Sequence, residues 1–351
     1  MISHNFSFLS LLIVAFFTAY LKNGLLVTAN MDDKYMTFGP VGDPPQLKRL
    51  SNGGNIKLQK TCGIAQQPAP MTEERIAGGK EALRGQLPWA VSLARTDGGN
   101  KCTAVLISEW HVLTAIHCFY NYVNHSVPCY GPSFDPKSID KSKYVIHYGG
   151  VCIRMDSSAG CELQDTQTVG MKKVVVGKDF TESLCQSGND VAIVELERNI
   201  SLNGDVQAIC LLDVTADDIL LASIHPHQSK VKNFIDMGWG QDEKGKSNAK
   251  LHFLEATPRH VRDNMLHSTA WKEGLDPGTR RGICNGDSGG PTQATGPGGK
   301  AYLMGIHSSG PPCTEAAPDK YGTYYSTFIP PMLDDICALT GVCPGDRMVK
   351  V

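Results

Sequence analysis

The chain has 351 residues, with 33 basic against 35 acidic side chains and a formal net charge of -2. This near balance provides no field that would hold nucleic acid or anionic lipid, which excludes both as expected partners. The 41% hydrophobic and 19% charged residues, with 36 glycines and 20 prolines, are typical of a globular protein rich in turns. The 12 cysteines indicate an oxidising compartment, because disulfides do not persist in the reducing cytosol. We therefore expect a secreted, extracellular protein.

The N-terminal segment begins with an apolar run from Phe8 to Leu21. This run is shorter than the roughly 20 residues needed to cross a bilayer. It predicts a signal peptide over residues 1–29, cleaved after Ala29, with an uncleaved membrane anchor as the alternative. Residues 30–75 are rich in Gly, Pro, Gln and Lys and have no sustained apolar period. They are expected to form a propeptide, or leader, that builds no core.

After the leader, short runs of Val, Ile, Leu and aromatic residues alternate with turn signals, which predicts antiparallel β-sheet. The expected strands are Trp89–Leu93, Thr103–Ile107, Val112–Ala115, Met171–Val176, Val191–Leu196, His252–Ala256 and Tyr302–Ile306. One helix is expected near the C-terminus, where two prolines suit a helix start. The apolar residues that follow are spaced to share one face: Met332, Leu333, Ile336 and Leu339.

Three distant segments carry the candidate chemistry. The stretch Asn285–Pro291 reads NGDSGGP and places the hydroxyl of Ser288 among residues with almost no side chain. Glycine lets backbone N–H groups converge on one point, as a developing oxyanion requires, although such a stretch alone is also typical of a surface turn. One expected strand ends at His117 and another begins at Asp190. A nucleophile, a base and an acid that orients the base are thus all present.

These segments, in this order, resemble the chymotrypsin-like (trypsin-fold, S1-type) serine peptidases. Arg75–Gly79 (RIAGG) and Leu87–Trp89 (LPW) add to the resemblance, which runs from Cys62 to about Leu339. It implies an all-β fold of two six-stranded antiparallel β barrels with the active site between them and a C-terminal helix. It also implies that residues 76–351 form the peptidase domain.

The resemblance assigns a role to each candidate. Ser288 would attack the scissile carbonyl, His117 would take and return the proton, and Asp190 would fix the imidazole tautomer. The backbone N–H groups of Gly286 and Ser288 would form the oxyanion hole. Ile116 stands where the family usually has alanine, and we expect this larger side chain to affect efficiency rather than the identity of the base.

Activation is expected at the bond between Arg75 and Ile76, which resembles the family's zymogen cleavage site and would require a trypsin-like activating protease. The freed amino group of Ile76 would then pair with Asp287 and order the oxyanion loop. An uncut surface loop is the alternative.

The cysteines match four bridges that the resemblance implies or their spacing favours. These are Cys102 with Cys118, Cys284 with Cys313, Cys62 with Cys210, and Cys337 with Cys343. The bridge from Cys62 would keep the cleaved leader attached. The remaining four, Cys129, Cys152, Cys161 and Cys185, allow three pairings. No C-x-x-C pair is present and His225-Pro226-His227 is typical of a solvated loop, so we expect no metal and no other cofactor.

Specificity is expected to favour large apolar or aromatic P1 residues and not Lys or Arg. The resemblance places Gly282 at the pocket base, where trypsin-like members carry aspartate, with Gly322 on one wall and Ser308, Ser309 and Gly310 on the substrate-binding strand. An open, uncharged slot favours apolar side chains. A slot narrowed by loops, with elastase-like preference, is the alternative.

The sequence therefore predicts a secreted serine endopeptidase that acts on protein or peptide substrates and meets protein inhibitors. The alternative is a catalytically weak binding protein that keeps the same fold, for which the long insertion at about residues 119–167 would serve. Sequons at Asn124 and Asn199 predict glycosylation.

Overall fold

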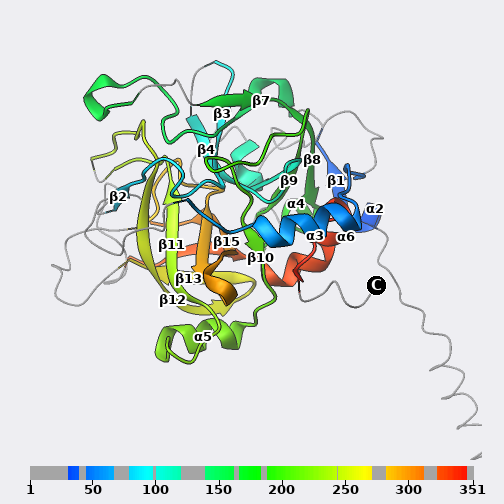
Figure 1. Ribbon diagram of the computed structural model, residues 1–351, viewed down its shortest axis with the longest axis vertical. Coiled ribbons are helices and arrows are strands. Elements are labelled where there is room, and N and C mark those ends of the chain that lie inside the picture. Colours follow the sequence, from blue (N-terminus) through cyan, green and yellow to red (C-terminus); the bar gives the residue numbers. More distant parts are fainter. Residues whose placement is uncertain are drawn as a thin grey trace, which may run out of the picture.

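Two β-sheets, antiparallel except for the short parallel pairing of the Cys210–Leu211 and Ala301–Ser309 strands, build the protein and pack against each other (Figure 1). The computed structural model describes residues 31–38, 45–66, 79–97, 100–119, 139–161, 166–182, 188–242, 244–270, 282–311 and 322–345. The predicted signal peptide, the predicted cleavage site, Asn124, Cys129, Cys185 and Cys313 lie outside these ranges.

The first sheet has eight strands in the order β1-β8-β9-β5-β4-β3-β6-β7. Their bounds are β1 Tyr35–Thr37, β3 Ala90–Arg95, β4 Asn100–Leu106, β5 His111–Thr114, β6 Tyr144–Tyr148, β7 Gln167–Val169, β8 Met171–Gly177 and β9 Ala192–Leu196. Only Gly170 separates β7 from β8, so one bent segment pairs first with β6 and then with β9. This bend curls the sheet into a barrel-like layer.

The second sheet follows the order β10-β15-β14-β11-β12-β13-β16, and β2 pairs with β12. The bounds are β2 Lys80–Glu81, β10 Cys210–Leu211, β11 Lys232–Gly238, β12 His252–Arg262, β13 Met265–Thr269, β14 Pro291–Thr295, β15 Ala301–Ser309 and β16 Tyr324–Phe328. An additional pairing of β15 with β16 closes the ring into a barrel. The expected all-β fold of two barrel-like sheets is confirmed; the second closes as a six-stranded barrel, and the first is an eight-stranded half-barrel.

Helices are few and short. They are α2 Met31–Lys34, α3 Asn52–Thr61, α4 Lys178–Glu182, α5 Ala216–Ile224 and α6 Leu333–Thr340, with 3-10 turns η1 Ile116–Phe119, η3 Lys141–Lys143, η4 Ser157–Ala159, η5 Pro297–Gly299 and η6 Pro330–Met332. The expected C-terminal helix is present as η6 followed by α6. Among the described residues, no helix is both long and apolar enough to cross a membrane.

Two tryptophans join the halves of the molecule. Trp89, just before β3, donates its indole N–H to the side chain of Gln293 on β14 at 2.7 Å. Trp239, just after β11, donates to the carbonyl oxygen of Val151 at 2.8 Å. Both side chains are almost fully buried, so these bonds satisfy the polar ends of large apolar groups. The two sheets are therefore held in one fixed arrangement, with the site residues at their border.

The described part of residues 30–75, the predicted leader, packs onto the rest of the protein, which was not expected from its sequence. Its strand β1 adds to the edge of the first sheet by pairing with β8. Its apolar residues Tyr35, Phe38, Leu47 and Leu58 are buried in the main core. The ring of Phe38 meets Phe119 of η1 edge to face, with 5.5 Å between centroids. The expectation that this segment contributes no core is therefore wrong.

Polar contacts fix the same segment. Helix α3 lies beside α6 (Figure 1), and Asn55 and Gln59 both donate to the carbonyl oxygen of Cys343. The backbone N–H of Lys48 donates to the buried carboxylate of Glu195 at 2.9 Å. The ammonium group of Lys48 lies 3.1 Å from the ring centroid of Trp110. These contacts tie the segment to Cys343, just after α6, and to β9 of the first sheet.

The disulfides follow the expected pattern where they are described. Cys62 bonds Cys210, Cys102 bonds Cys118, and Cys337 bonds Cys343. A bridge between Cys152 and Cys161 selects one of the three open pairings. Cys284 is also disulfide-bonded.

Candidate active site

His117 lies in η1, immediately after β5. The disulfide between Cys102 and Cys118 ties this short helix to β4. Ile116 is fully buried in the core, so its larger side chain is accommodated inside the barrel. The imidazole still contacts Asp190, and the expected cost of Ile116 is not visible in this geometry.

Asp190 lies just before β9 and is only 2% exposed. One carboxylate oxygen, Oδ1, accepts the backbone N–H of His117 at 3.1 Å. The other, Oδ2, lies 2.5 Å from His117 Nδ1 and accepts the hydroxyl of Ser308 at 2.7 Å. An ionised carboxylate can only accept hydrogen bonds, so the imidazole proton is held on Nδ1. Nε2 is then the nitrogen that can take a proton.

Ser288 lies in a tight turn that packs against the first sheet. The N–H of Gly290 donates to the carbonyl oxygen of Asp287 at 2.9 Å, and Thr103 on β4 donates its N–H to the Ser288 carbonyl at the same distance. Gly289 has φ +78°, and a Cβ there would lie 2.5 Å from the carbonyl oxygen of Thr103. Only glycine fits at this point, which lets the turn approach β4 closely.

The same turn borders the histidine helix. The sulfur of Cys118 lies 3.7 Å from the carbonyl oxygen of Ser288. A Cβ on Gly289 would also lie 2.8 Å from the backbone nitrogen of Ala115. The structure thus brings the serine turn next to the residues on both sides of His117, although the segments are far apart in sequence.

The two predicted oxyanion donors belong to peptides whose carbonyls are anchored. The carbonyl oxygen of Asn285, in the peptide that contains the N–H of Gly286, accepts from Gln241 at 2.8 Å. The carbonyl of Asp287, in the peptide of the Ser288 N–H, accepts the turn bond from Gly290. In a trans peptide the C=O and N–H point in opposite directions, so these bonds also set the directions of the two N–H groups.

The carboxylate of Asp287 is buried beneath this loop, at 1% exposure. Backbone N–H groups of Gly240 and Cys284 each donate to it at 2.8 Å. Burial nevertheless raises the pKa of Asp287 from 3.8 to about 6. A Cβ on Gly240 would lie 2.4 Å from the carboxyl carbon, so the loop fits closely around the acid. Ile76, its expected partner, lies outside the described residues.

The residues predicted at the base of the specificity pocket lie together. Gly282, with φ +147°, is buried against the ring of Tyr324, which a Cβ would meet at 3.1 Å. A Cβ on Gly310 would lie 3.7 Å from Cγ1 of Ile283 and 3.1 Å from Cβ of Tyr324. Ile283 is 8% exposed and was not singled out from the sequence. Its position next to Gly282 was the available signal, and its apolar side chain adds to the uncharged surface.

The other predicted pocket residues differ in their placement. The hydroxyl of Ser308 bonds Asp190, so its side chain belongs to the histidine–aspartate pair. Ser309 is exposed and Gly322 is half-buried just before β16.

Among the described residues, one group of potential metal ligands is close enough to share an ion: Cys102, His117 and Cys118. Both sulfurs are in a disulfide and the imidazole is bonded to Asp190. A disulfide does not offer the thiolates that a metal needs, so this group is not suited to coordination. His225 and His227 lie in an exposed turn.

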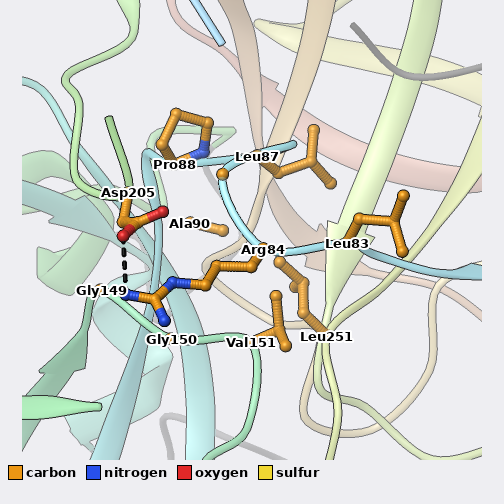
Figure 2. A pocket seen from close by; sticks show the side chains of 11 residues that line it. Leu83, Arg84, Leu87, Pro88, Ala90, Gly149, Gly150, Val151, Asp205 and Leu251 are labelled. Carbon is orange, nitrogen blue, oxygen red and sulfur yellow. Dashed lines mark hydrogen bonds and ion pairs between the residues drawn. The ribbon is translucent and has the colours of Figure 1, made fainter. Parts of the chain in front are cut away.

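A separate small hollow lies between the segment after β2 and the loop after β6 (Figure 2). It is lined by Leu83, Arg84, Gly85, Leu87, Pro88, Ala90, Gly149, Gly150, Val151, Asp205 and Leu251. Arg84 and Asp205 form an ion pair at 2.7 Å across it. Its volume of about 10 Å³ is room for about one water molecule. None of the candidate catalytic residues lines it.

Two known proteins that are similar to this chain are named as serine proteases. The profile of the family described as Trypsin matches residues 76–330. The chain is 26% identical over 336 residues to serine proteinase stubble of Drosophila melanogaster, covering 90% of this chain and 37% of that protein. It is 27% identical over 274 residues to transmembrane protease serine 9 of Rattus norvegicus, covering 75% of this chain and 22% of that protein. The chain thus spans well under half the length of these relatives. From the family profile over most of its length, the chain belongs to the trypsin family of serine proteases.

Proposed function

We propose that this chain is an endopeptidase whose catalytic residues are Ser288, His117 and Asp190. The observation that carries the proposal is the contact of 2.5 Å between His117 Nδ1 and Asp190 Oδ2, next to the Ser288 turn. This contact keeps the proton on the nitrogen that faces the acid. The opposite nitrogen, Nε2, is then the one that acts as a general base, a role that a merely structural histidine would not require.

The mechanism follows from these roles. Ser288 Oγ attacks the scissile carbonyl carbon while His117 Nε2 takes its proton, and the resulting oxyanion is held by the N–H groups of Gly286 and Ser288. The tetrahedral intermediate collapses as the imidazolium returns the proton to the leaving amine, which gives an acyl-enzyme. Water then repeats both steps and releases the acid. Each oxyanion donor is worth about 3–4 kcal/mol, a magnitude measured on serine proteases.

The chain is further proposed to be secreted after removal of residues 1–29 and to be activated by cleavage between Arg75 and Ile76. The buried carboxylate of Asp287 supports this, because its raised pKa means that it lacks full compensation by the described groups. A new ammonium group at Ile76 would supply that charge. Arg75→Gln is expected to stay uncut and inactive with a trypsin-like activator; full activity of the intact variant would contradict the zymogen proposal.

The cleaved leader is proposed to remain as a light chain. The bond between Cys62 and Cys210 supports this, and so does the burial of leader residues such as Phe38. After activation, a non-reducing gel would show one band and a reducing gel two.

Specificity is proposed to favour large apolar or aromatic P1 residues. Gly282 and Ile283 support this, because neither offers a charge to a basic side chain and Ile283 adds apolar surface. A P1-diverse peptide library tests the proposal, and a preference for Arg or Lys would refute it. A preference for Ala or Val would instead favour a narrowed, elastase-like slot.

The decisive experiment labels the activated protein with a fluorophosphonate. Wild type is expected to form a covalent adduct and to hydrolyse peptides, whereas Ser288→Ala forms no adduct. Ser157→Ala is the matched control, because this serine is exposed in η4 and is not one of the candidate site residues; it should be labelled like wild type. A correctly cleaved wild type that takes no label would favour the alternative, a catalytically weak binding protein.

A further inference from the structure

A cluster of polar side chains lies inside the second barrel, beneath the turn that carries Ser288. Its members come from four strands and are at most 1% exposed: Asp236, Thr292, His307, Tyr324 and Ser326. The strand register brings them together, because Asp236 pairs with Thr292 and His307 pairs with Ser326. A buried carboxylate is costly unless it is paired and hydrogen-bonded, so Asp236 requires partners within the cluster.

Asp236 is fully satisfied by three partners. Its Oδ1 lies 2.9 Å from His307 Nε2 and accepts the hydroxyl of Thr292 at 2.6 Å. Its Oδ2 accepts the hydroxyl of Tyr324 at 2.5 Å. The cluster therefore holds the Nε2 edge of the His307 ring.

The other ring nitrogen of His307 points at the catalytic turn. His307 Nδ1 lies 3.1 Å from the carbonyl oxygen of Asp287. A carbonyl oxygen can only accept, so Nδ1 must carry a hydrogen. Where Nε2 donates to the carboxylate of Asp236, both nitrogens carry a hydrogen and the ring is an imidazolium.

The charge of the ring is consistent with its surroundings. Burial alone would lower the pKa of His307, but Asp236 from β11 and Asp287 from the turn outweigh it and raise the pKa above its ordinary value. No net charge is buried by the ring and Asp236 together, because the two form an ion pair.

The backbone of His307 also grips the turn. Its carbonyl oxygen accepts the N–H of Gly289, and its own N–H donates to the carbonyl of Gly290, both at 2.8 Å. The ring and the main chain of one residue thus hold three positions of the turn. The ring bond is the one that acts on the peptide between Asp287 and Ser288.

That peptide also contains the N–H of Ser288, one of the two oxyanion donors. We propose that His307, held by Asp236, is a positioning residue of the oxyanion hole that fixes the Asp287–Ser288 peptide by donating from Nδ1 to its carbonyl oxygen. Because C=O and N–H of a trans peptide point in opposite directions, the bond aims the Ser288 N–H away from the barrel interior. Polarisation of the carbonyl also strengthens that N–H as a donor. This inference rests on the proposed endopeptidase function.

The test compares a peptide ester with its thionoester in activated, fluorophosphonate-titrated enzyme. A thiocarbonyl sulfur accepts hydrogen bonds more weakly than oxygen, so the ratio of the two kcat values reports on the oxyanion hole. The paired variant Asp236→Val with His307→Val removes the donor without leaving a lone buried charge. We expect kcat for the ester to fall roughly ten- to a hundredfold, below the 10²–10³ of a deleted donor, with KM little changed. The thionoester should lose much less.

Two further variants separate positioning from stability. Thr292→Val removes another partner of Asp236 but touches no oxyanion peptide, so it should lower thermal stability and keep the ester-to-thionoester ratio. His307→Gln keeps a side-chain N–H, so its ester-to-thionoester ratio of kcat values should lie closer to wild type than that of the paired variant. A wild-type ratio in the folded paired variant would overturn the proposal, as would an equal fall of the ratio in Thr292→Val.

A measurement on wild type covers the case in which the paired variant does not fold. Nitrogen-15 NMR of histidine-labelled protein should show one ring with both nitrogens protonated at pH 7 and protected from exchange. A His307 ring that carries hydrogen on Nε2 alone would overturn the inference. Failure of wild type to take the fluorophosphonate would instead refute the proposed function, so the two failures are distinguishable.

Discussion

Asp190→Asn tests the proposed triad most directly, because the geometry predicts which way the new amide turns. The backbone N–H of His117 donates to Oδ1, and only the amide oxygen of asparagine can replace that acceptor. The amide NH₂ must then take the place of Oδ2, facing His117 Nδ1. It would donate to Nδ1, move the ring proton to Nε2 and leave no base for Ser288.

The expected loss is large and can be compared with a smaller one at the same atom. In serine proteases with this triad, the wrong imidazole tautomer lowers kcat by about 10⁴-fold. Ser308→Ala removes only one hydrogen bond to the Oδ2 of the carboxylate, worth about 1.5–3 kcal/mol for a charged acceptor, or roughly 12- to 160-fold. A gap of roughly 60- to 800-fold between the two variants is therefore expected.

The assay is kcat on the preferred peptide after activation, with unfolding curves to show that both variants are folded. Both substitutions change the size of the side chain little, so we expect both variants to be about as stable as wild type. An Asp190→Asn enzyme within tenfold of wild type would refute the assignment of Asp190 as the residue that orients the base.

Two further predictions concern stability. Phe38→Ala should lower the free energy of unfolding by about 3–5 kcal/mol, because the ring is buried against Phe119. Ile56→Ala, at a site that is 47% exposed, should change the free energy of unfolding little. Urea unfolding measures both variants, and equal effects would argue against docking of the leader. The pKa of Asp287 is raised from 3.8 to about 6 in the folded protein, so the folded state binds this proton more tightly than the unfolded state does. The free energy of unfolding is therefore highest below about pH 4 and falls by about 3 kcal/mol as pH rises through 6. In the uncut Arg75→Gln protein this loss between pH 4 and 7 should disappear when Asp287→Asn is added, and a persistent loss of the same size would contradict it.

The parts predicted from sequence are those fixed by short-range chemistry. The NGDSGGP stretch predicted a tight turn around Ser288, and Gly289 indeed occupies a position where a Cβ would clash with β4. The strand runs around His117 and Asp190 predicted that both residues lie at strand ends, as β5 and β9 show. These signals depend on neighbours in sequence, and a pattern can report them.

Docking of the leader could not be predicted in the same way. Tyr35, Phe38, Leu47 and Leu58 show neither a strand nor a helix period, because each meets a different surface of the finished peptidase core. Strand β1 pairs only three positions with β8, which is too short for an alternating pattern. The information lies in the surface that covers these residues and not in the segment itself.

The polar cluster under the Ser288 turn is a third case. Its polar residues are visible in the sequence, but the sequence does not show which of them contact each other. Asp236 interrupts the apolar run from Phe234 to Met237, and His307 directly follows the apolar run Tyr302–Ile306. Only the register of β11, β14 and β15 brings them to one point. Two histidine–aspartate pairs then flank the same serine turn. His117 keeps 13% of its side chain exposed, whereas His307 has none exposed. In the proposed mechanism the same chemical pair therefore has two roles, proton transfer where solvent and substrate can reach it and fixed positioning where they cannot.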